Sequence, residues 1–248
     1  FFKQKTAYEI STRDWSSDVC SSDLTPLTTL RMAASMIDSA RDSFDPTIQR
    51  SVELMMIQLD RFERLLEDLL EISRFDAEVA VVDAVEFDIT DKVAKVISDL
   101  RLVAQEVGVH IEFDRPADSV YINADIRRIE RALRNLITNA IDHAEGKPIR
   151  VTLRANENAT SIGVRDFGIG LDQESAGRVF DRFWRADPSR SRLRGGTGLG
   201  LSLALEDAHL HHGEIEVFGK LGAGANFVLT IPKKVSSQIP QSLIPVKF

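Results

Sequence analysis

The stretch DIRRIERALRNLITNAIDH, residues 125–143, decides the fold, because its periodicity marks an amphipathic helix with two distinct faces. Apolar residues recur at alternating steps of three and four and therefore share one face; they are Ile126, Ile129, Leu133, Leu136 and Ala140. A second face carries polar side chains at steps of four, three and one, namely Asn135, Asn139, Asp142 and His143. The apolar face predicts a core, and the polar face a candidate site.

Two asparagines stand one turn apart in the middle of this helix, although asparagine is a mediocre helix former. The amide oxygen of Asn139 suits Mg²⁺, which takes oxygen ligands and needs few from protein when phosphate and water supply the rest. A pair of solvated asparagines is the alternative that the spacing alone leaves open.

Short β-rich stretches alternate with helical ones on both sides of this helix. Strands are expected at residues 85–89, 109–113, 120–123, 149–155, 161–165, 214–218 and 225–231, and further helices at 91–107 and 198–210. Such an order predicts a mixed sheet with helices on one face, an α/β sandwich.

Two glycine-rich stretches lie at the ends of these elements. In DFGIG, residues 166–170, Asp166 follows a strand and can accept a hydrogen bond from an amino group, while Gly168 and Gly170 allow a flat ligand to approach the backbone. In GGTGLGL, residues 195–201, unpaired amides at a helix start predict an anion site. A simple turn and a flexible hinge are the respective alternatives.

Between them, residues 178–194 hold six arginines and the possible loop anchors Phe180, Phe183 and Trp184. Local positive charge suits a neighbouring phosphate site, whereas a nucleic-acid surface is disfavoured by the net charge of -7. A further glycine turn, GAGANF at residues 222–227, leads into the last strand.

Upstream, apolar positions predict a helical hairpin. The first helix follows Leu27, Leu30, Ala34, Ile37 and Phe44, and Asp45-Pro46 interrupts it. The second carries a heptad seam, formed by Ile48, Val52, Met55, Leu59, Phe62, Leu66 and Leu69. Because two helices cannot bury this stripe, we expect a homodimer with a four-helix bundle; packing on the rest of the same chain is the alternative.

Composition narrows the class of protein. The single cysteine, Cys20, forms no intrachain disulfide, which fits a reducing cytoplasmic setting. No apolar run approaches the length of a membrane helix.

Taken in order, the Asn-bearing helix, DxGxG, the aromatic and basic segment, GxGLG and GxGxxF resemble the N, G1, F, G2 and G3 boxes of sensor histidine kinases over residues 25–231. This resemblance implies an α+β protein, with a hairpin for dimerisation and histidine phosphotransfer at residues 25–80 and a Bergerat-type ATP-binding sandwich at 85–233. Residues 234–248 are expected to form a disordered tail.

The resemblance also implies roles for individual residues. Asn139 would ligate Mg²⁺ on the ATP phosphates, beside Asn135, His143 and Asp142, a position that is often basic in the family. Asp166 would bind the adenine amino group. The remaining nucleotide contacts would come from Gly168, Gly170, Arg182, Arg185, Gly196, Thr197, Gly198, Leu199 and Gly200.

The implied activity is ATP-dependent autophosphorylation of a histidine, followed by phosphate transfer to an aspartate of a response regulator. Thr25 matches the polar position used in the reverse, phosphatase reaction, although a plain helix-start threonine would look the same. The parent protein is expected to be membrane-anchored, and this chain to be its cytoplasmic portion.

The chain departs from the family at the phosphoacceptor. The family's histidine precedes the motif proline by five residues, and Ser21 occupies that register before Pro26. Residues 1–24 resemble a translated sequencing-library adapter, so we expect them to be non-native and the chain to bind ATP without autophosphorylating. A dimeric ATP-binding scaffold without catalysis and another ATPase of the Bergerat fold are the alternatives.

Overall fold

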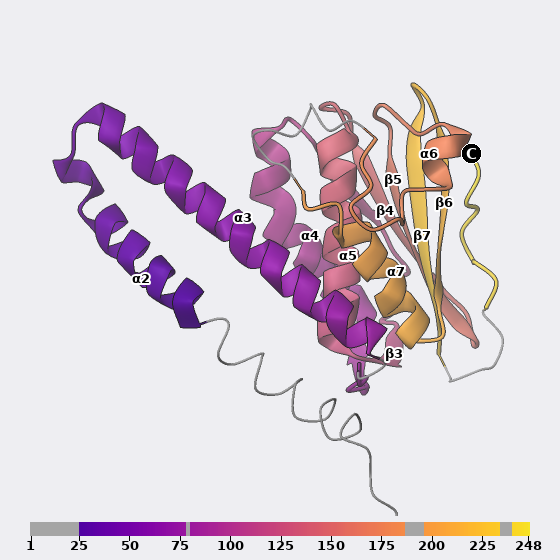
Figure 1. Cartoon of the computed structure of the whole chain (residues 1–248). Helices are drawn as coiled ribbons and strands as arrows, with labels where there is room; N and C mark the ends of the chain where they lie inside the picture. The colour runs from indigo at the N-terminus through magenta and orange to yellow at the C-terminus, as the bar shows by residue number, and fades with distance from the viewer. Residues whose placement is uncertain (1–24, 78–79, 187–195, 234–239) are drawn as a thin grey trace, which may run out of the picture. The chain divides into compact units, whose positions relative to one another are not determined.

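The computed structural model describes residues 25–77, 80–186, 196–233 and 240–248 of the 248-residue chain. The chain divides into two compact units, one ending at Asp76 and the other beginning at Ala77. The first unit is helical, and the second combines helices with β-sheets (Figure 1). Among the described residues, no helix is both long and apolar enough to cross a membrane.

The first unit is the predicted helical hairpin, built from α2 (Thr25–Ser39), the short 3₁₀ helix η1 (Arg41–Ser43) and α3 (Pro46–Asp76). The first helix ends earlier than Phe44 because the chain tightens into a 3₁₀ turn, with Ser43 N donating to Ala40 O at 3.0 Å. Pro46 opens α3, where its missing N–H costs nothing, and the Asp45 carboxylate accepts a hydrogen bond from Thr47 N at 2.8 Å.

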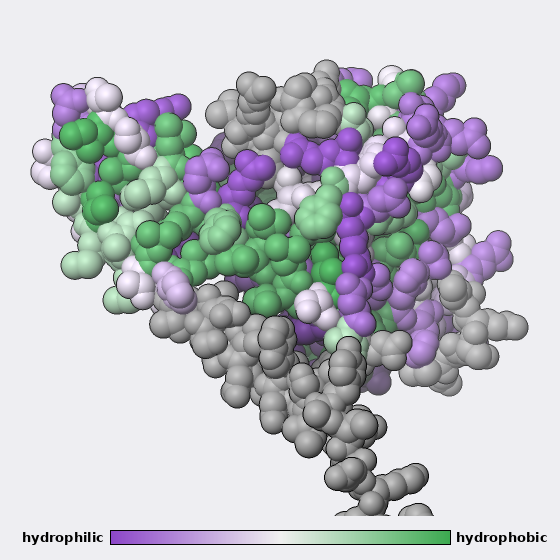
Figure 2. Space-filling model, in the orientation of Figure 1, coloured by the Kyte–Doolittle hydropathy of each residue, from purple (hydrophilic) through white to green (hydrophobic). Residues whose placement is uncertain are grey.

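The heptad seam of α3 is buried only in part. Val52 and Leu59 are 5% and 8% exposed, and Ala34 of α2 is also buried. Four other seam residues remain between 36% and 49% exposed, namely Ile48, Met55, Phe62 and Leu69. Apolar side chains are visible along the hairpin in Figure 2. The hairpin therefore keeps an apolar stripe uncovered.

The second unit is the predicted sandwich. Its main sheet has the order β2-β4-β5-β7-β6, formed by Ile111–Asp114, Ile149–Ala155, Ala159–Asp166, Gly224–Pro232 and Glu214–Lys220. Only the β2 and β4 pair is parallel. A separate antiparallel pair joins β1 (Val85–Asp88) to β3 (Tyr121–Ala124).

The long helices of this unit lie on one face of the main sheet (Figure 1), and their apolar sides form the core with it. They are α4 (Ile89–Glu106), α5 (Ile126–His143) and α7 (Gly200–Leu210); the one-turn helix α6 (Gln173–Ala176) is much shorter. The predicted elements are present, with boundaries that move by a few residues. For example, α4 begins at Ile89 because the Asp88 carboxylate caps it, accepting a hydrogen bond from Thr90 N at 2.8 Å.

The C-terminal segment differs from expectation. A disordered tail over residues 234–248 is wrong for residues 240–248, which lie along the main sheet on the side opposite the helices (Figure 1). The amide of Leu243 donates to Ser161 Oγ at 3.0 Å, and Asn226 Nδ2 donates to Pro245 O and Val246 O at 3.1 and 3.0 Å. These bonds hold a segment whose sequence has no period; residues 234–239 lie outside the described part.

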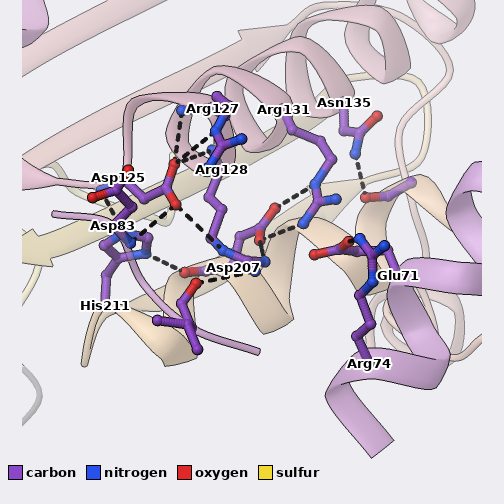
Figure 3. A network of polar contacts seen from close by, with 12 residues as sticks. Glu71, Arg74, Asp83, Asp125, Arg127, Arg128, Arg131, Asn135, Asp207 and His211 are labelled. Carbon is purple, nitrogen blue, oxygen red and sulfur yellow. Dashed lines mark hydrogen bonds and ion pairs between the residues drawn. The ribbon is translucent and has the colours of Figure 1, made fainter. Parts of the chain in front are cut away.

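A buried carboxylate joins α7 to α5 (Figure 3). Asp207 is fully buried and accepts hydrogen bonds from Arg131 Nη2 at 2.6 Å, Arg131 Nε at 2.8 Å and Arg128 Nη1 at 3.2 Å. Burial raises the pKa of Asp207, although both arginines act in the opposite direction. The bidentate contact with Arg131 fixes the distance between the two helices.

A second contact joins the same helices near Asp207. Asp125 N donates to His211 Nε2 at 3.0 Å, so the other ring nitrogen carries the proton and donates to Asp207 O at 2.6 Å. The C-terminal end of α7 is thus bonded to the residue that caps the start of α5.

Asp207→Ala is expected to lower the free energy of unfolding of the second unit by about 3 to 5 kcal/mol, because it removes the carboxylate that compensates two partly buried guanidinium groups. The matched control is Asp99→Ala, which removes the exposed partner of Arg134 and is expected to cost about 1 kcal/mol or less. Urea denaturation followed by Trp184 fluorescence measures both. Equal losses in the two variants would contradict the role given to Asp207.

Candidate functional site

The face of α5 that carries the asparagines lies beside the start of α7. Asp125 caps α5 by accepting hydrogen bonds from Arg127 N at 3.0 Å and Arg128 N at 3.3 Å. Most of the predicted apolar stripe is fully buried, and Ile126 is half-buried. Asn135 and Asn139 are half-buried on the second face, which continues into the exposed Asp142 and His143. The predicted division of the helix into two faces is confirmed.

Asn135 binds the first turn of α7 directly. Its Nδ2 donates to Gly200 O at 2.8 Å (Figure 3), and a Cβ atom at position 200 would lie 3.1 Å from Asn135 Oδ1. Helix α7 was predicted from residue 198 but begins at Gly200, since Gly198 adopts a positive φ of 75° that a helix cannot contain. The contact brings two sequence-predicted motifs together.

The loop before α7 is held by contacts of its own. Leu199 N donates to Thr197 Oγ1 at 3.2 Å, and the Leu199 side chain is fully buried, so Leu199 anchors the loop in the core. Gly198 O accepts a hydrogen bond from Phe183 N at 2.9 Å. Leu199 stands at the N-cap position of α7, and its side chain accepts no hydrogen bond from the helix. The amides of the first turn of α7 therefore stay available to an anion.

The basic segment is described only in part. Arg182 forms an ion pair with Glu206 of α7 at 3.8 Å, and Arg185 is half-buried. Residues 187–195, which include Arg190, Arg192 and Arg194, lie outside the described part of the chain. Ser21 also lies outside it. Thr25 is the first residue of α2.

Asp166 is the most deeply buried polar group of the candidate site. It ends β5, is 2% exposed, and accepts hydrogen bonds from Gly168 N at 2.9 Å and Ala225 N at 3.2 Å. Burial nevertheless raises its pKa, against these two bonds and the nearby charge of Arg165. The carboxylate is therefore short of donors, and a ligand amino group would supply one.

Gly168 and Gly170 are required for another reason than the predicted approach of a ligand. A Cβ atom on Gly168 would lie 1.8 Å from His143 O, and one on Gly170 would lie 2.0 Å from Lys220 O. These glycines pack the turn after β5 against the end of α5 and against β6. They place Asp166 near the polar end of α5, where a positive charge on His143 would act against the rise in the pKa of that carboxyl.

Some contacts of the site have no signal in the sequence. The second backbone donor to Asp166 is Ala225 of β7, 59 residues away, and nothing in the local sequence marks its amide as a partner of Asp166. Arg165, Asp207 and His211 also act on the site's elements, yet each looks like an ordinary strand or helix residue in the sequence.

Two family models match the chain. Residues 24–78 match the His Kinase A (phospho-acceptor) domain, and residues 124–235 match the histidine kinase-, DNA gyrase B- and HSP90-like ATPase. The first match covers the hairpin, and the second covers α5, the turn after β5 and α7. The two expected domains are thereby found in the expected order.

Among curated proteins, the chain is 48% identical to the sensor histidine kinase MtrB of Mycobacterium tuberculosis over 95% of this chain and 41% of MtrB. It is 34% identical to the signal transduction histidine-protein kinase AfsQ2 of Streptomyces coelicolor over 92% of this chain and 43% of AfsQ2. The chain thus spans about two fifths of the length of these relatives.

Solved structures share the fold. The full-length ShkA structure in complex with AMPPNP superposes with a TM-score of 0.75 at 23% identity, over 90% of this chain and 47% of ShkA. The histidine kinase AdeS of Acinetobacter baumannii gives a TM-score of 0.63 at 21% identity, over 84% of this chain and 98% of AdeS.

Gly168→Ala is expected to disrupt the site, because the added methyl group would overlap His143 O and move the turn that holds Asp166. Gly177→Ala is the matched control, since Gly177 has an ordinary φ of -71° and a Cβ atom there would lie 3.5 Å from its nearest neighbour, Glu174 O. We expect Gly168→Ala to lower the unfolding temperature by about 4 °C or more and to abolish binding of a fluorescent ATP analogue. Gly177→Ala should retain both stability and binding; the reverse order would contradict this account of the turn.

Proposed function

Because the chain belongs to the sensor histidine kinase family, we propose that its parent protein is a kinase of a two-component system. The protein binds ATP with Mg²⁺, phosphorylates a histidine on its helical hairpin and passes the phosphate to an aspartate of a response regulator. The second unit holds the nucleotide, and the hairpin serves dimerisation and phosphotransfer.

One observation carries the nucleotide assignment. The Asn135–Gly200 hydrogen bond fixes the open start of α7 beside the asparagine face of α5, and the turn after β5 packs on the other end of that helix. A buried carboxylate and an anion-binding helix start thus flank one polar helix face. Adenine fits the first, and a chain of phosphates fits the second.

Asn139 fits Mg²⁺ as a single protein ligand. Within the described residues, no group of three or more His, Cys, Asp or Glu side chains gathers that would hold a metal by itself. The half-buried amide of Asn139 suits an ion that otherwise takes phosphate and water oxygens. Bound there, Mg²⁺ would neutralise charge on the phosphates during transfer.

The remaining chemistry places few demands on this unit. In the transfer, the bond from the γ-phosphorus to the leaving oxygen of ADP breaks as a bond to an imidazole nitrogen forms. Neutral imidazole is a usable nucleophile near neutral pH. The residues of this chain therefore bind and orient ATP. Asp166 binds the adenine base, Asn139 and Asn135 lie along α5, and the start of α7 binds the phosphates.

The hairpin supports dimerisation and partner binding. Its exposed apolar stripe, which includes Met55 and Phe62, is buried when two hairpins form a four-helix bundle. Thr25, at the start of α2, is proposed to act in the reverse, phosphatase reaction. A receiver domain of a response regulator would dock beside it.

The proposed ligands also indicate the subcellular location of this chain. ATP and response regulators are found in the cytoplasm, so we infer that this chain is the cytoplasmic portion of a kinase anchored in the membrane by segments outside it.

Asp166→Ala is expected to weaken ATP binding about tenfold to a hundredfold, because it removes a hydrogen bond to a charged group of roughly 1.5 to 3 kcal/mol. Isothermal titration with ATP measures the change. Asp114→Ala, which removes an exposed carboxylate paired with Arg154 at the sheet edge, is the control and should bind normally.

The pH dependence sharpens this test. The pKa of Asp166 is raised, so on acidification it gains a proton at a higher pH than an ordinary aspartate. The protonated form is a weaker acceptor, and ATP affinity is therefore expected to fall as the pH drops. Asp166→Asn should bind weakly and lose this dependence; an unchanged pH profile would reject the adenine assignment.

The chain with the present sequence is expected to bind ATP without phosphorylating itself. Ser21 stands in the register of the phosphoacceptor, and all five histidines, at positions 110, 143, 209, 211 and 212, belong to the second unit. Incubation with γ-labelled ATP should leave no acid-labile, base-stable label. Such a label would show that another residue accepts the phosphate, whereas loss of ATP binding altogether would favour a scaffold without nucleotide.

A further inference from the structure

The outer face of the main sheet is built to receive residues 240–248. Gly163 leaves room for Ile244, whose Cγ2 lies 3.3 Å from where a Cβ atom of residue 163 would be. Ser161 Oγ accepts from Leu243 N and shares a hydrogen bond of 2.9 Å with Thr230 Oγ1. Ser161 and Asn226 are both buried, and their partners include the backbone of this segment. We call residues 240–248 the strap.

The strap ends over the guanidinium group of Arg165. The Phe248 ring centroid lies 3.2 Å from Arg165 Cζ, and the Phe167 ring centroid lies 4.7 Å from it. Phe248 is itself held edge-to-face by Phe218, with the ring centroids 5.1 Å apart. Burial lowers the pKa of Arg165; Phe248, itself 51% exposed, shields one side of the group in part.

Arg165 fastens two turns that lie far apart in the sequence. Its Nη1 donates to Asp166 O at 2.6 Å and its Nη2 donates to Ala223 O at 2.5 Å. Gly168 of the first turn and Ala225, at the start of β7 directly after the second turn, supply the amides that orient the Asp166 carboxylate. A Cβ atom on Gly224 would lie 2.1 Å from Asp166 O, so the turns are in direct backbone contact.

We propose that Arg165 is a positioning residue for adenine recognition, and that the strap tightens ATP binding by holding Arg165 through Phe248. The inference rests on the proposed function of Asp166 as the adenine acceptor. Hydrogen bonds from a charged donor strengthen where water is excluded. Covering Arg165 therefore stiffens the two turns, and a stiffer pair of turns holds the carboxylate in the direction in which the adenine amino group donates.

Packing of the strap on the sheet and binding of ATP are therefore thermodynamically coupled. If the strap raises the affinity for ATP, ATP raises the affinity of the strap for the sheet by the same factor. The strap binds the outer face and the nucleotide the opposite side, so neither needs to touch the other.

The experiment compares ATP with inosine triphosphate, which has an oxo group where adenine has its amino group. The full chain, a chain ending at residue 239, and the full-length variants Phe248→Ala and Arg165→Gln are titrated with both nucleotides. We expect each change to weaken ATP binding about fivefold or more, with a much smaller effect on inosine triphosphate. Lys247→Ala, which changes an exposed strap residue, should behave as the full chain does.

A peptide of residues 240–248 supplies the matched rescue. Added to the chain ending at residue 239, it should restore ATP affinity, whereas the same peptide with Phe248→Ala should not. If the shortened chain does not fold, as judged by circular dichroism, the two full-length variants decide the matter.

The outcomes separate two kinds of failure. Equal losses for the two nucleotides would mean that the strap only stabilises the fold, and unchanged ATP affinity in Phe248→Ala and Arg165→Gln would remove the positioning role. Either result overturns the inference and leaves the function in place, provided that Asp166→Ala abolishes the preference for ATP. If Asp166→Ala leaves that preference intact, the adenine assignment itself fails.

Discussion

The attachment of α7 to α5 is the constraint on which the candidate site depends. Near one end of the contact, Asp207 and Arg131 form a buried bidentate pair; near the other, Asn135 holds Gly200 O at 2.8 Å. Two fixed points prevent α7 from sliding or rotating on α5. The first-turn amides of α7 are thereby held beside Asn135, one helical turn before Asn139, at a position that a ligand does not have to organise. A phosphate chain that bridges the two helices then meets a site formed in advance.

The proposed adenine end of the site is set by close backbone packing. Turns from two distant parts of the chain approach so closely that only hydrogen fits on the α-carbons of Gly168, Gly170 and Gly224. This packing removes Asp166 from water, and the resulting cost appears as a raised pKa. A buried carboxylate with too few donors favours a ligand that brings one. The same close packing therefore makes the turns rigid and makes the Asp166 carboxylate favour a ligand with an amino group.

Much of this architecture follows from local sequence. The periodicity of α5 predicted its apolar and polar faces. The glycine motifs pointed to Asp166 and to the start of α7. Both are local features, because they depend on residues that are neighbours in the sequence. Contacts between distant residues were not predictable in this way. Arg165, Asp207 and the strap have no periodicity or turn signal, and the strap was expected to be disordered because it lacks the pattern of a helix or strand. Its order comes from the sheet beneath it, chiefly Ser161 and Asn226.

The second unit and the hairpin each have a face that another segment has to cover, and they cover it in different ways. A face of a sheet or helix pair stays in water unless another segment packs on it. In the second unit, residues 240–248 pack on the outer face of the sheet at Ser161, Gly163 and Asn226 and bring a Phe ring to Arg165. The hairpin has no such segment among the described residues, and Ile48, Met55, Phe62 and Leu69 stay substantially exposed on α3. Full burial of such a side chain is worth about 1.5 to 3 kcal/mol, and a second hairpin that covers the stripe gains the part that is still exposed, on both copies. The sequence of α3 itself thus favours dimerisation.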